Sequence, residues 1–598
     1  METFQKILAR SVSEALKKAE LPEAGEVTPA TDPRFGDYQT NAALILGKQR
    51  GENPRKVAAA ILAHLDTASL TEPPTVAGAG FINFTLRREA VEARVNALLR
   101  DDRFGVPKAA TPKRIVIDLG SPNVAKPMHV GHIRSLFLGD ALARIAQFMG
   151  HEVIRDNHIG DWGTQFGMVI WGWKNLLDRD RLQKDPIDEL VRIYKETNEK
   201  ATKDPQIREA ARQELVKLQS GDPENVSIWR ETVELSLREF ERAYRLLDIH
   251  YDIQRGESFY NDRLGGVVER LLKRGIAQIS EGAVCVFFPD IPELADKPAI
   301  IRKQDGGFNY ATTDVATTDY RTNDLKADAA WYVVGAPQSL HFRQIFEIAR
   351  REGGKAELRH IPFGSILGED RKLMKTRSGE SVPLRELLEE AIARARKIVD
   401  EKNPGLTEAE KADVAQKIGI GAVKYADLSQ YRMTDYVFSW DKMLSLHGNT
   451  APYLQNAYVR IRSIFRKAGD CSRPAASGRD ETPRHSDELP PLIPKSPASY
   501  AVATTDKVIL NEPAEIAIGK RLAQFAEVVP QVLNDFRPNI LANYLFELAN
   551  NFHTFYEACP VLKAEDSIRA SRLALSDLTG RVLRQGLELL GIDVPEKM

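Results

Sequence analysis

The stretch S-P-N-V-A-K-P-M-H-V-G-H, from Ser121 to His132, lies where an apolar strand ends and a helix begins. The preceding K-R-I-V-I-D-L is β-branched and apolar, as expected of a buried strand, and apolar residues recur at helical spacing from Ile133 until Gly150. Open α/β sheets bind their ligands where such strands end. The stretch therefore predicts an α/β fold with a binding site at the end of this strand.

Two histidines, His129 and His132, open the predicted helix. Residues three apart lie on one helix face, so both imidazoles can point at one ligand, and the free N–H groups of the first turn attract phosphate. Gly131 leaves room for a flat ring against the backbone. An H-x-x-H pair by itself is also compatible with a metal half-site or with helix capping.

Composition narrows the class of protein. The 598 residues imply about three to five domains. With 43% apolar and 28% charged residues and no apolar run near about 18 residues, we expect a globular protein without a membrane span. The N-terminal M-E-T-F-Q-K-I-L-A-R predicts an amphipathic helix and no secretory signal.

The three cysteines are solitary, and neither a C-x-x-C pair nor an H-E-x-x-H motif occurs. We therefore expect no disulfide framework and no zinc site, which fits a reducing cytoplasm.

A net charge of −1 supplies no overall attraction for nucleic acid, so local basic groups must do so. Two candidates are a loop and a helix, with the residues Arg371, Lys372, Lys375 and Arg377 in the loop and Arg460, Arg462, Arg466 and Lys467 on the helix. Either group alone is more typical of a solvated surface.

Three regions follow one another along the chain. Residues 1–110 combine helices with a short strand-like segment, and residues 111–390 form an α/β unit. In that unit W-Y-V-V-G at 331–335 predicts a second strand, again followed by a helix from Ser339 to Arg351. Residues 391–598 are helical in pattern.

Two segments interrupt these regions. Residues 175–245 are charged and helical in pattern, which predicts helices packed beside the sheet. Residues 471–497 are rich in proline and serine, which predicts a mobile surface loop.

Together with S-P-N and Lys126, the histidine pair resembles the HIGH signature of class I aminoacyl-tRNA synthetases, in the extended form of arginyl-tRNA synthetases. N-H-I-G-D-W-G-T-Q-F-G at 157–167 is similar to the same family, although its glycines alone indicate only a structural turn. The HIGH region comprises Pro122, Asn123, Val124, Ala125, Lys126, Pro127, Met128, His129, Val130, Gly131 and His132.

The resemblance covers nearly the whole chain and is closest to bacterial members. It implies a Rossmann-type nucleotide-binding catalytic domain at 111–390, with the helical insertion near 175–245. It also implies an N-terminal α+β domain at 1–110 that contacts the tRNA elbow, and a C-terminal all-helical DALR anticodon-binding domain at 391–598. In that last domain Tyr453, Phe555 and Tyr556 are candidates for stacking on anticodon bases, although aromatic residues on helices more often belong to a core.

Residue roles follow from the same resemblance. The arginine side chain would be held by Tyr310, Asp314 and Glu257, its α-amino and carboxylate end by Asn123 and Gln338, and Ser121 would line the site. ATP would be bound by His129, Gly131, His132 and Met374. Tyr310 and Asp314 are four apart, on one face if the segment is helical, where a single acidic residue is usually solvated surface. The pair gains interest because the guanidinium that the resemblance implies requires planar, acidic recognition.

The second class I signature departs from its usual K-M-S-K-S form. In G-E-D-R-K-L-M-K-T-R-S-G, Leu373 and Thr376 stand where lysines are usual. The resemblance implies that Lys126 substitutes for the missing lysine, with Lys375 or Lys372 assisting. Fixed cations are needed because negative charge develops on the phosphates.

The implied activity is that of an arginine–tRNA ligase. Arginine would attack Mg·ATP to give arginyl-adenylate and pyrophosphate, and the 3′ end of the cognate tRNA would then take the arginyl group. His129 and His132 would donate hydrogen bonds to the phosphates as charge builds. We expect ATP with Mg²⁺ as substrate, no tightly bound cofactor, no metal-ligating residues, no membrane association, a monomer and a cytoplasmic location.

Three alternatives are less favoured. A cysteinyl or glutamyl class I ligase shares the histidines, but a cysteine-specific enzyme requires a zinc site, and Tyr310 with Asp314 favours a cationic substrate. A non-catalytic tRNA-binding paralogue is opposed by the intact His129, His132 and Lys126. A Walker-type ATPase is opposed by the lack of a G-x-x-x-x-G-K-[ST] motif.

Overall fold

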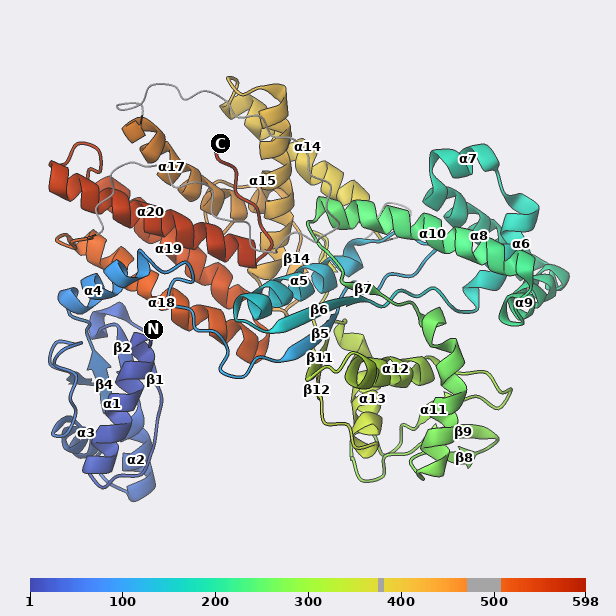
Figure 1. Cartoon of the computed structure of the whole chain (residues 1–598), viewed down its shortest axis with the longest axis horizontal. Coiled ribbons are helices and arrows are strands. Elements are labelled where there is room, and N and C mark those ends of the chain that lie inside the picture. Colours follow the sequence, from blue (N-terminus) through green and yellow to red (C-terminus); the bar gives the residue numbers. More distant parts are fainter. Residues whose placement is uncertain (375–380, 470–506) are drawn as a thin grey trace.

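A five-stranded parallel sheet lies at the centre of the computed structural model, which describes residues 1–374, 381–469 and 507–598 (Figure 1). Its strand order is β12-β11-β5-β6-β7. The strands are β5 (Arg114–Asp118), β6 (Glu152–Asn157), β7 (Ile253–Gln254), β11 (Ala329–Tyr332) and β12 (Glu357–His360). From β5 the chain builds outward first to β6 and β7 and later to β11 and β12. The order therefore reverses between β5 and β11, and the carboxyl ends of these strands are the place where such sheets bind ligands.

Helices cover both faces of this sheet, which confirms the predicted α/β fold. Helix α5 (Ile133–Phe148) shares a core with Ile115 and Ile117 of β5. On the other face Tyr332 of β11 packs on rings of α13 (Ser339–Arg351), and α12 (Tyr310–Asp319) lies beside α13. The predicted strand before Ser121 and the predicted helix Ser339–Arg351 are both present.

The start of α5 corrects one expectation. The two histidines do not lie within its first turn, because Val130–His132 form a separate 3₁₀ turn and α5 begins at Ile133. His129 is the N-cap of that short turn, so the histidine side chains themselves cap the backbone.

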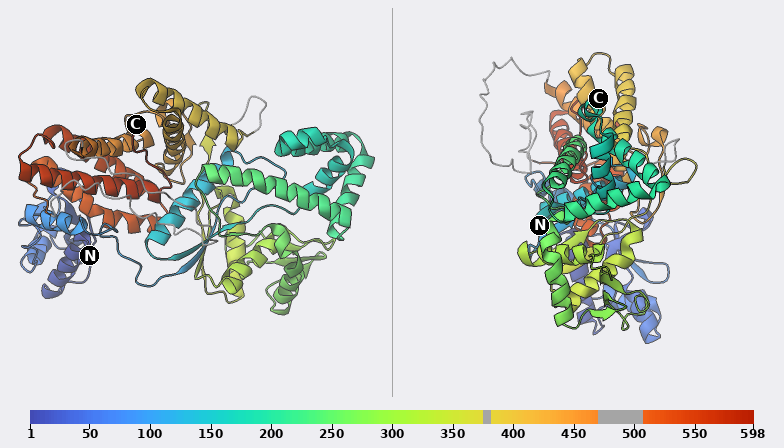
Figure 2. Two further views of the ribbon diagram at one scale, coloured as in Figure 1. Left: turned by 45° about the horizontal axis from the view of Figure 1, so that its top comes forward. Right: turned by 90° about the vertical axis from the view of Figure 1, so that its right-hand side faces the viewer.

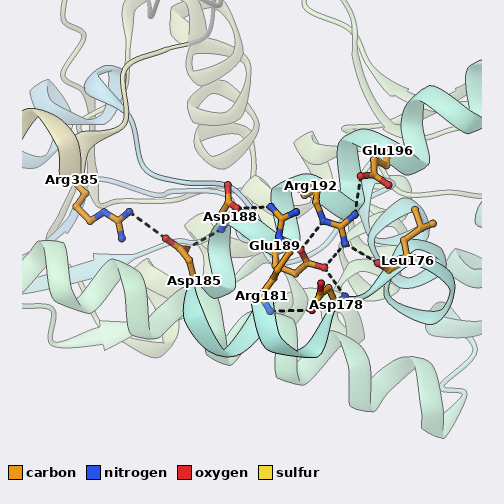
Figure 3. Close-up of polar contacts among 9 residues, drawn as sticks. All are labelled: Leu176, Asp178, Arg181, Asp185, Asp188, Glu189, Arg192, Glu196 and Arg385. Carbon is orange, nitrogen blue, oxygen red and sulfur yellow. Dashed lines mark hydrogen bonds and ion pairs between the residues drawn. The ribbon is translucent and has the colours of Figure 1, made fainter.

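The helical insertion joins β6 to β7 and extends from Gln165 to Leu246. It consists of α6 (Gln165–Leu176), α7 (Arg179–Lys184), α8 (Pro186–Lys203), α9 (Pro205–Gln219) and α10 (Pro223–Leu246). Fully buried Glu189 accepts from the backbone N–H of Asp178 at 2.8 Å and pairs with Arg192, which also donates to the carbonyl of Leu176 at 2.7 Å (Figure 3). This network ties α6, α7 and α8 together.

A smaller α+β layer joins β7 to β11. It contains α11 (Asn261–Lys273), the antiparallel sheet β10-β9-β8, and α12, which continues into a π-helical turn at Tyr320–Asp324. The three strands are β8 (Gln278–Ser280), β9 (Ala283–Val286) and β10 (Ala299–Arg302). This layer has its own core, so α12 is held from both sides.

The N-terminal region contains four helices and a four-stranded antiparallel sheet of order β1-β2-β4-β3. Its elements are α1 (Phe4–Lys18), β1 (Val27–Pro29), β2 (Tyr38–Thr40), α2 (Ala42–Arg50), α3 (Pro54–Leu62), β3 (Thr75–Ala77), β4 (Phe81–Phe84) and α4 (Arg88–Leu98). It lies at the opposite end of the molecule from the insertion (Figure 2).

The C-terminal region is almost entirely helical. It contains α14 (Leu384–Lys402), α15 (Glu408–Leu428), α16 (Trp440–Met443), α17 (Ala451–Gly469), α18 (Pro513–Asp535), α19 (Asn539–Ala558) and α20 (Asp566–Leu589), and its short β14 (Tyr436–Val437) pairs with β13 (Ile366–Leu367). The loop predicted at 471–497 lies outside the described residues. Within the described part of the chain, no helix combines the length and apolar character needed to cross a membrane.

Buried contacts join the N-terminal region to the C-terminal helices. The hydroxyl of Tyr38 donates to the carboxylate of Glu527 on α18 at 2.9 Å, and the backbone N–H of Gln5 donates to the same carboxylate at 3.0 Å. Burial raises the pKa of Glu527. The interface is therefore a packed, hydrogen-bonded contact between segments nearly the whole chain apart.

A buried guanidinium joins the two central strands at their carboxyl ends. Arg321, in the π-helical turn, is fully buried and donates to Asp118 at the end of β5 and to Asp156 near the end of β6, each at 2.9 Å. Its guanidinium also lies 4.9 Å from the ring centroid of Tyr332. The smaller α+β layer is thereby anchored to the sheet.

Replacing Arg321 tests this anchor. Arg321→Met leaves two buried carboxylates without a cation, so we expect the free energy of unfolding to fall by about 3–5 kcal/mol. Urea denaturation followed by tryptophan fluorescence measures it. Arg238→Met is the control, because Arg238 and Glu234 form an exposed ion pair on α10. Equal denaturation midpoints for the two variants would contradict the anchoring role.

Candidate active site

The HIGH region leaves the carboxyl end of β5 in a strained conformation. Ser121 and Ala125 both have left-handed backbone, with φ of 46° and 58°. Such residues lack glycine's freedom and cost of order 1–3 kcal/mol each. Ser121 Oγ donates to Asp118 Oδ1 at 2.6 Å, and the N–H of Ala125 donates to Ser236 Oγ of α10 at 3.0 Å. The loop is therefore held by the sheet on one side and by the insertion on the other.

The segment 157–167 lies directly against the HIGH region. The N–H of Gly160 donates to the carbonyl of Pro122 at 3.0 Å, and the N–H of Val124 donates to the carbonyl of Gly160 at 3.2 Å. A Cβ at Gly160 would lie 2.0 Å from Asn123 Oδ1. Only glycine leaves room for the Asn123 side chain, so this turn both supports the structure and shapes the site.

Both histidines contact the neighbouring backbone through Nδ1. His129 Nδ1 accepts from the N–H of Gly131, and His132 Nδ1 accepts from the N–H of His129, both at 3.1 Å. The ring centroids are 4.2 Å apart. His132 Nδ1 also lies 3.2 Å from the carbonyl oxygen of His129. Because Nδ1 of His129 is an acceptor, the neutral ring of His129 carries its proton on Nε2. Burial, followed by the charge of Lys126, lowers the pKa of His129, and burial lowers that of His132 to about 4.

Lys126 is exposed beside these rings. Its Nζ lies 5.7 Å from the ring centroid of Tyr194 on α8 of the insertion. The one side chain that the sequence favoured as the replacement cation is thus next to the histidines, and it remains free to reach an anion.

The segment that follows the second signature lies beside the HIGH region. The N–H of Val130 donates to the carbonyl of Val382 at 3.0 Å, and the N–H of Leu384 donates to the carbonyl of Met128 at 2.8 Å. Met374 is partly buried against the main core, and its N–H contacts the carbonyl of Ile366 at 3.4 Å. Lys375, Thr376 and Arg377 lie outside the described residues.

Two carboxylates gather at the carboxyl end of the sheet, close to the HIGH region. Glu257 begins a short turn after β7, and its N–H donates to the carbonyl of Ile159, next to Gly160. Burial raises the pKa of Glu257 to about 7; His158 opposes this shift, and Asp314 and Asp161 add to it. Glu257 and Asp314 thus act on one another electrostatically, as expected of a pocket made for a cation.

Asp314 and Tyr310 share the face of α12 that meets α13. Asp314 Oδ2 lies 2.6 Å from His341 Nε2, and the ring centroid of Tyr310 lies 4.8 Å from that of His341. Tyr310 is 61% exposed, so most of its ring is available to a ligand. The predicted pairing of these two side chains on one helix face is present.

Gln338 ends a 3₁₀ turn after β11 and is exposed. The predicted arginine-binding residues therefore come from the loops after β5, β7 and β11 together with the first turns of α12. The topology brings them to one edge of the sheet, although more than 200 positions separate Ser121 from Gln338.

Several residues of the site were not singled out from the sequence. Asp161 is buried, and it accepts from the N–H and the hydroxyl of Ser258 at 2.8 and 2.6 Å, which holds the turn that carries Glu257. Its signal was present, since it belongs to the segment 157–167. No pattern of residue spacing in the sequence indicated Arg321 or His341, because the residues that they contact are distant in the sequence.

The C-terminal aromatic candidates differ from one another. Phe555 is completely buried, so it belongs to the core and is no longer a candidate for stacking on anticodon bases. Tyr453 is partly buried, and its hydroxyl donates to Asn550 at 2.6 Å. Tyr556 is 37% exposed, with the guanidinium of Arg460 5.5 Å from its ring centroid. Arg466 of the basic helix donates to the carbonyl of Glu596 at 2.8 Å.

Three family models match the chain in succession. Residues 3–86 match the arginyl tRNA synthetase N-terminal domain, residues 94–440 match the catalytic domain of the class I (R) tRNA synthetases, and residues 454–598 match the DALR anticodon binding domain. The chain is an arginyl-tRNA synthetase family member. In this synthetase the HIGH region, Glu257 and Asp314 all lie within the residues that match the catalytic domain.

Individual proteins that are similar to this chain belong to the same family. The arginine–tRNA ligase of Thermobifida fusca is 46% identical over 99% of both chains, and that of Synechococcus elongatus is 44% identical over 96% of this chain and 95% of its own. The fold of the synthetase is similar to the solved arginyl-tRNA synthetases of Plasmodium falciparum and Thermus thermophilus. Their TM-scores are 0.82 and 0.80, at 28% and 26% identity and with full coverage of both chains.

The protonation state of His132 can be measured. Its folded pKa of about 4 lies below the ordinary 6.5, so we expect a neutral ring at pH 7. Protonation favours the unfolded chain, and the stability that the buried neutral ring contributes is lost as pH falls from 6.5 towards 4. Nitrogen NMR of histidine-labelled protein checks this, with His132→Gln to assign the signal. Titration near 6.5 would contradict it.

Proposed function

We propose that this chain is an arginine–tRNA ligase that activates L-arginine with ATP and transfers it to the 3′ end of its cognate tRNA. The observation that carries the proposal is the electrostatic division of one site. Two coupled carboxylates, Glu257 and Asp314, lie at one part of it, and Lys126 with two neutral imidazoles lies at another. A molecule with a cationic side chain and a reactive carboxylate suits this division, with its carboxylate directed to the phosphates.

The first step forms arginyl-adenylate. A carboxylate oxygen of arginine attacks the α-phosphorus of Mg·ATP, the bond from that phosphorus to the bridging oxygen breaks, and pyrophosphate leaves. Mg²⁺ enters with the triphosphate as part of the substrate. His129 and His132 donate their Nε2–H groups to the phosphates, and these bonds strengthen as negative charge develops.

Neutral imidazoles are suited to this work. They are oriented by backbone N–H groups and need no rearrangement when charge appears, because burial keeps their pKa low. Lys126 supplies the net positive charge that a lysine of the second signature supplies elsewhere in the family, and Lys375 and Met374 of the second signature assist it. No side chain forms a covalent bond to the substrate.

The second step transfers the arginyl group. A hydroxyl of the terminal adenosine of the tRNA attacks the carbonyl carbon, and AMP leaves with the bonding electrons. Asn123, held over Gly160, and Gln338 bind the α-amino and carboxylate end of arginine, with Ser121 lining the site. Tyr310, Asp314 and Glu257 hold its guanidinium.

The surrounding domains bind the tRNA. In this proposal residues 1–110 contact its elbow, residues 111–390 carry the chemistry, and the helices of 391–598 bind the anticodon. We propose that the ligase acts as a monomer in the cytoplasm, where its cysteines stay reduced.

Pyrophosphate exchange into ATP tests the function. We expect exchange with arginine alone among the amino acids, and only when total tRNA is added. His132→Ala should lower the exchange rate far more than it weakens arginine binding, whereas His64→Ala, at an exposed position of the N-terminal domain, should leave both unchanged.

Other outcomes have defined meanings. Exchange with another amino acid would keep the class I chemistry and contradict the roles of Tyr310, Asp314 and Glu257. No exchange at all, with tRNA still bound, would indicate the non-catalytic paralogue.

Arginine affinity should depend on pH through Glu257. With a pKa of about 7 in the free site, Glu257 is partly protonated at neutral pH, while a bound guanidinium favours the carboxylate. Arginine binding therefore releases a proton. The dissociation constant for arginine should be about tenfold larger at pH 6 than at pH 8. Titration calorimetry in two buffers of different ionisation enthalpy measures both effects.

Glu257→Gln is the matched variant. It keeps the shape of the side chain and removes the titrating group, so its arginine affinity should be weaker and nearly independent of pH over the same range. An unchanged pH dependence in this variant would assign the effect to another group.

A further inference from the structure

His341 is the side chain that joins the two α12 residues of the arginine pocket. It lies in the first turn of α13, and its imidazole is 10% exposed. Its Nε2 is 2.6 Å from Asp314 Oδ2, and its ring centroid is 4.8 Å from that of Tyr310, with the planes tilted by 56°. One imidazole therefore contacts both residues.

The contact with Asp314 limits how that carboxylate can turn. The Nε2–H donates to one lone pair of Oδ2, which leaves Oδ1 and the second lone pair of Oδ2 to accept from a ligand. A carboxylate held in this way is already oriented for the two parallel N–H groups of a guanidinium. The side chain of Asp314 is only 24% exposed, so the surrounding protein also restricts its rotation.

The contact with Tyr310 has a similar effect. Tyr310 is the most exposed aromatic residue near the pocket. Its ring packs against the ring of His341. Phe342 in turn packs edge-on against His341 at 5.5 Å and is buried against Tyr332 of β11. The position of His341, and through it that of Tyr310, is therefore set by the central sheet.

We propose that His341 is a positioning residue for arginine recognition, which holds Asp314 and Tyr310 in the orientation that a guanidinium requires. The inference rests on the proposed function and adds a residue to it. His341 does not touch the substrate in this arrangement. It acts by lowering the conformational freedom that Asp314 and Tyr310 would otherwise lose on binding.

Three substitutions separate the two contacts. His341→Ala removes both of them. His341→Gln places an amide N–H near the position of the imidazole Nε2 and so keeps the donor to Asp314. His341→Phe keeps a ring against Tyr310 but has no donor. His250→Ala is the control, because His250 and Asp248 form an exposed imidazole–carboxylate pair away from the pocket.

The measurements are pyrophosphate exchange with tRNA present and arginine binding by titration calorimetry. For His341→Ala we expect KM and Kd for arginine to rise about tenfold or more, since a hydrogen bond to a charged group is lost, while KM for ATP and kcat stay within about threefold. His341→Gln should recover most of the arginine affinity, and His341→Phe should recover little of it.

The opposite results would overturn the inference. His341→Ala with the arginine affinity of His250→Ala would show that His341 does not position the pocket. Parallel losses in kcat, ATP affinity and melting temperature, without rescue by His341→Gln, would show a merely structural residue. Rescue by His341→Phe alone would also overturn the role of the donor. A wild-type protein that does not activate arginine would instead refute the proposed function.

Discussion

The buried guanidinium of Arg321 is the interaction on which the rest of the site depends. It joins Asp118 and Asp156, at the carboxyl ends of the two central strands, within a region that water does not reach. The second oxygen of Asp118 then accepts from the hydroxyl of Ser121, which holds the first left-handed residue of the HIGH region. The strained loop, the strand ends and the π-helical turn are thus joined through one carboxylate.

This arrangement also decides which charges remain for substrates. Arg321 neutralises the carboxylates at the strand ends, so Glu257 and Asp314 are left without an arginine or lysine partner in the described structure. On the other side, burial keeps His129 and His132 neutral, and the charge of Lys126 acts on His129. In the proposed function, the acidic part of the site receives the cationic side chain of the substrate, and the part with Lys126 and the imidazoles receives the phosphates.

Much of this was predictable where the pattern was local. The strand before Ser121, the helix Ser339–Arg351 and the pairing of Tyr310 with Asp314 each depend on residues within a few turns of one another. The helix boundary after His132 was misplaced, because the histidine side chains cap the backbone and replace the first helical turn. Of the aromatic candidates, Phe555 belongs to the core, as aromatic residues on helices more often do, and the sequence does not reveal which of them faces outward.

The sequence by itself determined the chemistry of the HIGH region, the order of the domains and the resemblance to one family, since these are properties of contiguous residues. Only the tertiary structure decided that Arg321 serves Asp118 and Asp156, that Gly160 makes room for Asn123, and that His341 joins Asp314 to Tyr310. The physical reason is the parallel sheet. Its crossover connections bring strand ends together that are far apart in the chain, and no local pattern records which side chains then meet.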